Sequence, residues 1–381
     1  MKIKFIIKII IGIIVAILIV VGGIWLGAHK KSVPAGKEVI KIGFIGPLTG
    51  ELALWGENQK SGIELASEQI NKQGGINGLP VKVIYEDSQC DPKNSVSAIK
   101  KLIEIDGVKA IIGDTCSSAV LAIAPIAEEK KIPLIAPIAA ADQISEAGDY
   151  IFRNFVTNSK YGIFAGKQLK QEGKNTVAVI YLNNDYGKNL AEDFFVNYEA
   201  NGGKIVFDEG YNNDVKDFRT LLTKAKDKNP DVIFLAGYYP DGAIILKQAE
   251  ELNIRIEFFG GGDAYDDLGL VSLAGKASEN FRFLSIPMGG GPTFGQFSQT
   301  YKAKYSKEPP VYSDYAYDAF MVMVGAIRKA GLDTTAIKNA LYETDYAGAS
   351  DMIRFDEKGD IINPKIIIKI IKDSKIVIYK E

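Results

Sequence analysis

The chain has 381 residues, more than one hydrophobic core usually organises, so we expect two folded lobes. Hydrophobic residues make up 47% and charged residues 24%, which excludes a disordered chain, a collagen-like chain and a polytopic membrane protein. Acidic residues outnumber basic ones, 47 to 45, and five of the lysines lie within residues 1–31. The remainder is therefore clearly acidic, which argues against nucleic-acid binding.

The N-terminus predicts a membrane-directed segment. Lys2, Lys4 and Lys8 precede an apolar run over residues 9–28, which is long enough for a helix to cross a bilayer. We expect residues 1–28 to be an uncleaved transmembrane anchor, with a cleaved signal segment as the alternative. No Cys lies in or just after this run, so no lipoprotein site is expected. Residues 29–38 are polar and contain Pro and Gly, as in a short tether.

From residue 39 onward, short β-rich runs alternate with helical periodicity. This order is typical of parallel sheets covered by helices, an α/β fold. In the first set we predict strands over 39–45, 81–86, 109–113 and 132–136, and helices over 57–72, 94–105 and 118–130. These elements predict one doubly wound lobe.

A second set repeats the pattern. We predict strands over 176–182, 205–208, 231–236, 256–259 and 281–286, and helices over 159–172, 186–200, 216–226 and 241–252. A helix-rich stretch over 292–343 is followed by a terminal hairpin that turns at Asp373 and Ser374. We therefore assign residues 39–157 and 287–350 to lobe 1, and residues 158–286 and 351–381 to lobe 2. A hinge of several strands should cross near 155–158, 285–288 and 349–352.

The two cysteines, Cys90 and Cys116, both lie beyond the predicted anchor. An even number of cysteines in an exported chain favours a disulfide. Each follows a predicted strand, where the loops of neighbouring parallel strands converge, so we expect a Cys90 to Cys116 bridge. Two buried thiols are the alternative.

The sequence argues against a catalytic function. The only histidine, His29, stands beside the predicted anchor, which excludes a Ser-His-Asp or Cys-His arrangement and a His-based zinc site in the body. The chain has no CxxC pair, P-loop or calcium-loop pattern. The run over residues 43–50 lacks the spacing of a dinucleotide-binding turn, and Asp266 and Asp267 are typical of a solvated loop. We expect no catalytic residue, no metal and no cofactor.

Several loops together resemble those of the branched-chain amino-acid-binding proteins of ABC importers, in the type I periplasmic-binding-protein family. The resemblance runs from about residue 40 to the C-terminus. Its motifs are IGPLTGELALWGENQKSGIELASEQINKQGGINGLPV, EDSQCDPKNSV with IIGDTCSSAV, NNDYGKNLAEDF, AGYYPDGAIILKQA, FFGGGDAYDD and FDEKGD. The resemblance also implies the disulfide between Cys90 and Cys116.

The resemblance implies which residues contact the two charged ends of the ligand. Ser117 and Ser118 stand at the start of a predicted helix, where a hydroxyl and free backbone N–H groups can hold a carboxylate. An ordinary helix N-cap is the alternative. Asp263 matches the acid that pairs with the ligand's ammonium group, and such a pair strengthens when a cleft encloses it.

The resemblance implies further ligand contacts. Tyr186 and Tyr238 match aromatic positions of the second-lobe wall, and Trp55 and Tyr265 are expected to frame the pocket. A core role is equally open for each aromatic residue. In the loop over residues 135–145, Ile138, Ala139 and Ala140 are expected beside the ligand. Amino-acid binders usually place a Thr or Ser hydroxyl where this chain has Ala140, so an amide, a short peptide or a small carboxylate stays open as the ligand.

These observations predict an extracytoplasmic solute-binding protein. We expect it to bind an amino acid between its lobes by hinge closure, to act as a monomer and to deliver its ligand to ABC permease subunits in the membrane. A sensory ligand-binding ectodomain with the same fold is the second hypothesis, and an extracytoplasmic amidase is the third.

Overall fold

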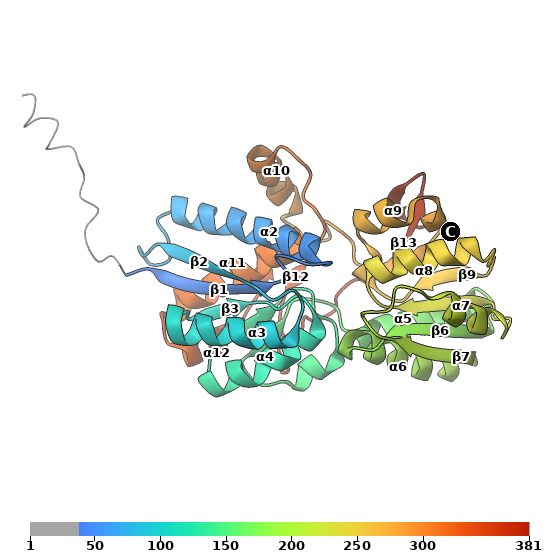
Figure 1. Cartoon of the computed structure of the whole chain (residues 1–381). Coiled ribbons are helices and arrows are strands. Elements are labelled where there is room, and N and C mark those ends of the chain that lie inside the picture. The colour runs from blue at the N-terminus through green and yellow to red at the C-terminus, as the bar shows by residue number, and fades with distance from the viewer. Residues whose placement is uncertain (1–37, 381) are drawn as a thin grey trace, which may run out of the picture. The chain divides into compact units, whose positions relative to one another are not determined.

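A computed structural model describes residues 38–380 of the chain. The predicted anchor over residues 1–28 and the predicted tether, apart from its last residue, lie outside the described residues. Within residues 38–380, no helix combines the length and the apolar character that a membrane crossing requires. The compact unit Ile40–Glu381 contains two large sheets, each surrounded by helices (Figure 1). We call each sheet with its helices a lobe.

The first lobe is built on a five-stranded parallel sheet in the order β2-β1-β3-β4-β5. Its strands are β1 (Ile40–Gly46), β2 (Val81–Asp87), β3 (Ala110–Ile112), β4 (Leu134–Ala136) and β5 (Ile151–Arg153). One face packs against α2 (Ala53–Lys72), α11 (Ser313–Ala330) and α12 (Thr334–Tyr342), and the other against α3 (Pro92–Lys100) and α4 (Ser117–Lys130). The small helix α10 (Phe294–Tyr305) lies beside α2 (Figure 1).

Because helices cover both faces of this sheet, β1 is an almost continuous apolar run rather than an alternating one. Ile42 and Phe44 pack with α2 and α11, whereas Ile45 packs with α3 and α4. Helices α2 and α11 approach very closely at Gly62, because a Cβ there would lie 2.0 Å from the carbonyl oxygen of Ser313. Only glycine fits at that contact.

The second lobe is built on a seven-stranded sheet in the order β14-β13-β10-β9-β8-β6-β7. Its strands are β6 (Thr176–Leu182), β7 (Lys204–Tyr211), β8 (Val232–Ala236), β9 (Glu257–Gly260), β10 (Arg282–Ser285), β13 (Ile367–Lys372) and β14 (Lys375–Ile378). Its helices are α5 (Asn158–Gln171), α6 (Asp185–Ala200), α7 (Arg219–Lys226), α8 (Tyr239–Glu251) and α9 (Leu268–Ala274). Strands β6 to β10 pair in parallel, as predicted, and β13 adds an antiparallel edge.

The C-terminal hairpin confirms the predicted turn. Strands β13 and β14 pair antiparallel, and the two residues between them, Asp373 and Ser374, have φ values of 51° and 57°. Positive φ at both central residues is typical of a two-residue turn that matches the twist of the strands.

The chain passes between the lobes three times within residues 38–380. The crossings lie between β5 and α5, between β10 and α10, and over residues 362–366. The third differs from the predicted one near 349–352. Residues 351–361, including the second strand of the pair β11 (Tyr346–Ala347) and β12 (Met352–Ile353), pack with lobe 1 because Ile353, Phe355 and Ile361 enter its core.

The strand orders show where loops converge. In lobe 1 the order reverses between β1 and β3, and in lobe 2 between β6 and β8. Doubly wound sheets bind ligands beyond the carboxyl ends of the strands at such reversal points. A ligand site is therefore expected at the loops after β1, β3, β6 and β8 and at the loops beside them.

Candidate ligand-binding site

A small cavity lies between the two lobes. The centre of a water molecule can occupy about 20 Å³ of it, roughly the room for one or two waters. Both lobes line this cavity, which we call the inner cavity. Its lining residues are Trp55, Thr115, Cys116, Ser117, Ile138, Tyr186, Tyr238, Asp263, Ala264 and Tyr312.

The first-lobe wall is the N-terminus of α4. Helix α4 begins at Ser117, after Cys116 in extended conformation. The carbonyl oxygen of Cys116 accepts the N–H groups of Ala119 and Val120, both at 3.0 Å. The N–H groups of Ser117 and Ser118 have no acceptor inside the helix, as is general for a first turn. The positive end of the helix dipole adds to them, so this wall favours an anion.

Two hydroxyl groups reinforce this wall. Ser117 Oγ accepts the N–H groups of Ala140 (3.2 Å) and Ala141 (3.1 Å), and Thr115 Oγ1 accepts a hydrogen bond from Gln59 Nε2 (2.8 Å). A hydroxyl that accepts can still donate its own proton. Both hydroxyls therefore remain able to donate to an anionic ligand group.

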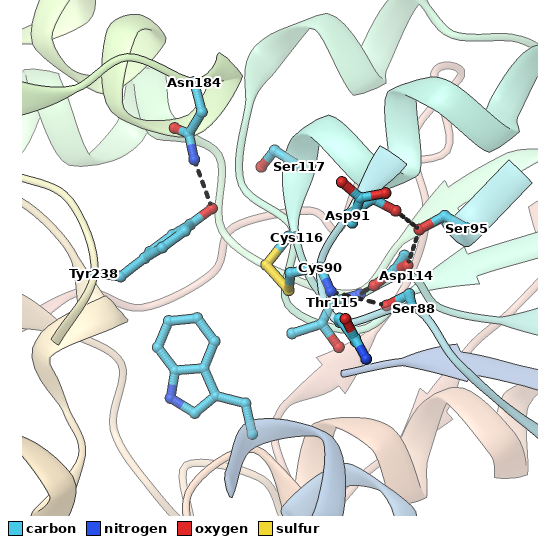
Figure 2. The surroundings of a disulfide bond; sticks show 12 residues. Ser88, Cys90, Asp91, Ser95, Asp114, Thr115, Cys116, Ser117, Asn184 and Tyr238 are labelled. Atoms are coloured by element: carbon cyan, nitrogen blue, oxygen red, sulfur yellow. Dashed lines mark hydrogen bonds between the residues drawn. A yellow bond between two sulfur atoms is a disulfide. The ribbon is translucent and has the colours of Figure 1, made fainter. Parts of the chain in front are cut away.

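A disulfide and a buried carboxylate hold the wall in place (Figure 2). The predicted bridge between Cys90 and Cys116 is confirmed, with a Cα–Cα distance of 5.5 Å. Asp114, which is fully buried, accepts hydrogen bonds from Ser95 Oγ (2.7 Å) and from the N–H of Thr115 (2.5 Å). Burial raises the pKa of Asp114, and the serine hydroxyls around it oppose that rise.

The second-lobe wall carries a single carboxylate. Asp263 follows β9 and is 4% exposed. Tyr312, at the start of α11 in lobe 1, donates its hydroxyl to Asp263 Oδ2 at 2.7 Å. Burial raises the pKa of Asp263 to about 6, and the Tyr312 hydrogen bond opposes the rise. Within residues 38–380 Asp263 has no ion-pair partner, so a ligand cation would be its first.

Aromatic rings complete the cavity. Tyr186 and Tyr238 stack with ring centroids 5.3 Å apart, and Trp55 meets Tyr238 (5.4 Å) and Tyr312 (5.8 Å) edge-on. Such pairs hold rings in fixed relative positions. The Tyr186 hydroxyl is buried and makes no hydrogen bond within the described part of the chain. It is therefore available to a ligand.

Contacts across the lobes surround the cavity. Trp55 Nε1 donates to Asp267 Oδ2 (3.1 Å), and the N–H of Asp185 donates to Ser118 Oγ (3.2 Å). Burial raises the pKa of Asp267 to about 6, against its hydrogen bonds from Gly269 and Trp55. The described conformation is thus one in which the lobes touch around the site.

The predicted site residues divide into two sets. Those that line the inner cavity are Trp55, Ser117, Ile138, Tyr186, Tyr238 and Asp263. Ser118 faces a neighbouring outer pocket, and Ala139 and Ala140 are buried beside the cavity without lining it. Tyr265 packs in the lobe 2 core, 5.4 Å from the ring of Phe281, because its ring fills the space under β9 and β10.

Sequence reasoning missed four lining residues. Thr115, Cys116 and Ala264 lie within two positions of predicted ligand residues, so extending each loop by two positions would have found them. Tyr312 offered no such signal, because it precedes a helix in the stretch over 292–343 and follows no predicted strand. It reaches the site with a φ of 70°, which a sequence pattern does not reveal.

The cavity has the chemistry of a binding site for a zwitterion. Asp263 is the one ionisable carboxylate among its lining residues, and the start of α4 faces it from the other lobe. Within residues 38–380, no group of three or more His, Cys, Asp or Glu side chains could hold a metal ion. An anionic group fits near Ser117 and a cationic group fits near Asp263.

Known proteins resemble the chain over most of its length. The family described as periplasmic binding protein matches residues 39–375. The leucine-, isoleucine-, valine-, threonine- and alanine-binding protein of Pseudomonas aeruginosa is 32% identical over 331 residues, which cover 86% of this chain and 88% of that protein.

Two solved structures are similar throughout. The leucine-binding protein of Thermotoga maritima matches with a TM-score of 0.84 and 29% identity, covering 90% of this chain and 98% of that one. The branched-chain amino acid transporter substrate-binding protein of Streptococcus pneumoniae, in complex with isoleucine, matches with a TM-score of 0.81 and 28% identity over 89% and 98%. With the family match spanning nearly the whole described body, the chain belongs to the periplasmic binding proteins, in the group that includes the branched-chain amino-acid-binding proteins.

Proposed function

We propose that this protein captures a branched-chain or similar aliphatic amino acid outside the cytoplasm and presents it to an ABC importer. One observation carries the proposal. The buried carboxylate of Asp263 and the start of α4 belong to different lobes yet line the same cavity. The relatives named as binders of leucine, isoleucine and valine support the same ligand class.

The proposed mechanism is hinge closure. The ligand carboxylate first meets Ser117 and its helix in lobe 1, where the wall is already formed. Rotation about the three crossings then brings Asp263, Tyr186 and Tyr238 onto the ligand, and each new contact favours the closed form. A permease that recognises the closed arrangement of the lobes would accept only the loaded protein.

We further propose that the protein acts as a monomer, held at the membrane by residues 1–28. The apolar run over residues 9–28 supports the anchor. Fractionation of cells that express the full chain is the test. Recovery in the soluble extracytoplasmic fraction, with residues 1–28 removed, would replace the anchor with a signal segment.

Isothermal titration of the purified full-length chain tests the ligand. We expect binding heat from leucine, isoleucine or valine. The matched controls are leucine analogues that lack either the carboxylate or the ammonium group, and each should bind about 100-fold more weakly. If no aliphatic amino acid binds, the proposed function is wrong. If the analogue without the ammonium group binds as well as leucine, the role of Asp263 is wrong.

A further inference from the structure

The inner cavity has a larger neighbour. An outer pocket of about 410 Å³ opens at the edge of the lobe contact, and it too is lined from both lobes. Two residues, Cys116 and Tyr238, line both hollows. They form the wall between a space that holds one or two waters and a space more than large enough for a side chain.

The two hollows differ in chemistry. Apart from Asp263 and the start of α4, the inner cavity is bounded mainly by aromatic and apolar side chains. The outer pocket has more hydrogen-bonding side chains, among them Gln89, Ser118, Asn184, Asn213 and Asp241, which lie beside Leu52, Pro92 and Pro240. A group that reaches the outer pocket would exchange apolar contacts for hydrogen bonds.

The outer pocket favours a neutral polar group over an anion. Two carboxylates line it, Asp241 of lobe 2 and Glu51 of lobe 1, and Lys216 pairs with both, at 3.3 Å and 3.2 Å. One ammonium group therefore serves two carboxylates, so no positive charge is left to attract an anion. An amide can donate to and accept from the surrounding Gln and Asn side chains.

The two residues of the dividing wall differ in how firmly they are held. Cys116 is fixed by its bond to Cys90 (Figure 2). Tyr238 is held by noncovalent contacts alone, namely the stack on Tyr186, the edge of Trp55, and a hydrogen bond from Asn184 Nδ2 to its hydroxyl at 3.2 Å. Removal of the Tyr238 side chain would join the two hollows without disturbing the disulfide.

We propose that Tyr238 is a partition that limits the length of the ligand side chain, and that the outer pocket behind it is a latent subsite for an amide-ended side chain. The inference rests on the proposed function, because it assumes that Ser117 and Asp263 fix the two charged ends of an amino acid. With those ends fixed, a short aliphatic side chain stays among the rings. A longer side chain meets Tyr238.

Titration of the purified full-length chain with L-valine, L-glutamine and L-glutamate tests this inference. The wild type should bind valine at least 30-fold more tightly than glutamine. Tyr238→Ala should reduce this preference about tenfold or more through a gain in glutamine affinity. Glutamate, which matches glutamine in size but carries an anion, should gain nothing. Tyr238→Phe keeps the ring and should keep the wild-type preference.

A second substitution tests whether the gain in glutamine affinity comes from the outer pocket. Asn213 is exposed at the outer pocket, so Asn213→Ala should leave folding unchanged. In the Tyr238→Ala background it should weaken glutamine binding and leave valine binding unaltered. If Tyr238→Ala still binds valine and gains no affinity for glutamine, the partition is disproved while the proposed function stands. If the wild type binds no amino acid, the proposed function fails first.

Discussion

The two walls of the inner cavity are built in different ways. The lobe 1 wall is held by a covalent brace, the Cys90 to Cys116 disulfide, and by hydrogen bonds to the buried Asp114. The loop behind it is held by the fully buried Arg153, which donates to Asp360 Oδ1 and to the carbonyl oxygen of Ala141, each at 2.8 Å. The lobe 2 wall consists of stacked rings and one carboxylate, Asp263, whose hydrogen-bond donor Tyr312 comes from the other lobe.

The difference separates two tasks. A braced helix start can present N–H groups to an anion whether the lobes are open or closed, because the disulfide, Asp114 and Arg153 all belong to lobe 1. In the described conformation the Asp263 carboxylate is buried against Tyr312 of the other lobe, and burial without a cation raises its pKa. The first wall therefore sets where a ligand binds, and the second makes closure depend on the ligand's positive charge.

Removal of the brace should give the largest effect. Cys90 and Cys116 are 26 positions apart, and closing a loop of that length stabilises a fold by about 3.5 kcal/mol. We expect Cys90→Ala with Cys116→Ala to lower the free energy of unfolding in urea by about that amount. Reduction of the wild-type bridge should shift the transition in the same direction. An unchanged midpoint in both experiments would show that the wall does not need the brace.

Loss of the second-wall charge should affect binding rather than folding. Asp263→Asn keeps the shape but leaves the ligand ammonium without a counter-charge, so we expect a loss of about 3 kcal/mol in binding, on the order of 100-fold. The melting temperature of the unliganded protein should not fall, because a buried charge is removed. Asp208→Asn, at an exposed position of β7, is the matched control and should change neither quantity. Retained affinity in Asp263→Asn would contradict the two-wall scheme.

The pH dependence of ligand affinity tests the role of the lobe 2 wall, because that wall carries the titrating carboxylate. The folded-state pKa of Asp263 is raised to about 6, so a proton competes with the ligand ammonium below that value. Affinity should fall about tenfold between pH 7 and pH 5, and Asp263→Asn should abolish that part of the dependence. The folding stability of the unliganded protein should depend on pH in the opposite direction. The unfavourable contribution of Asp263 is present above pH 6 and disappears as pH falls.

Much of the fold follows from local patterns. Strand β6 coincides with its predicted span of residues 176–182, and the turn at Asp373 and Ser374 was placed correctly. Both depend on interactions between residues close in sequence. The third crossing was misplaced, because the apolar residues Ile353, Phe355 and Ile361 show that the segment is buried but not in which lobe.

The site was predictable to the same extent. Ser117 and Asp263 follow strands within five residues, at the edge where the loops of a parallel sheet converge, and both line the cavity. Tyr312 enters from a helix far along the chain and bonds to Asp263 only after the lobes have met. Tyr265 was expected in the wall, yet its ring faces the core, because the direction of a side chain in a short 3₁₀ turn does not follow from sequence spacing.

The smallest expected effect concerns the contact that joins the two walls. Trp55→Phe keeps an aromatic ring but removes the hydrogen bond to Asp267, which is worth about 1 kcal/mol to the closed form. Ligand affinity should fall about fivefold, mainly through faster dissociation in stopped-flow measurements. Asp267→Asn is the partner change. If the two residues act through this bond, the double variant should lose less than the sum of the single losses, whereas strictly additive losses would show that Trp55 acts through its ring contacts alone.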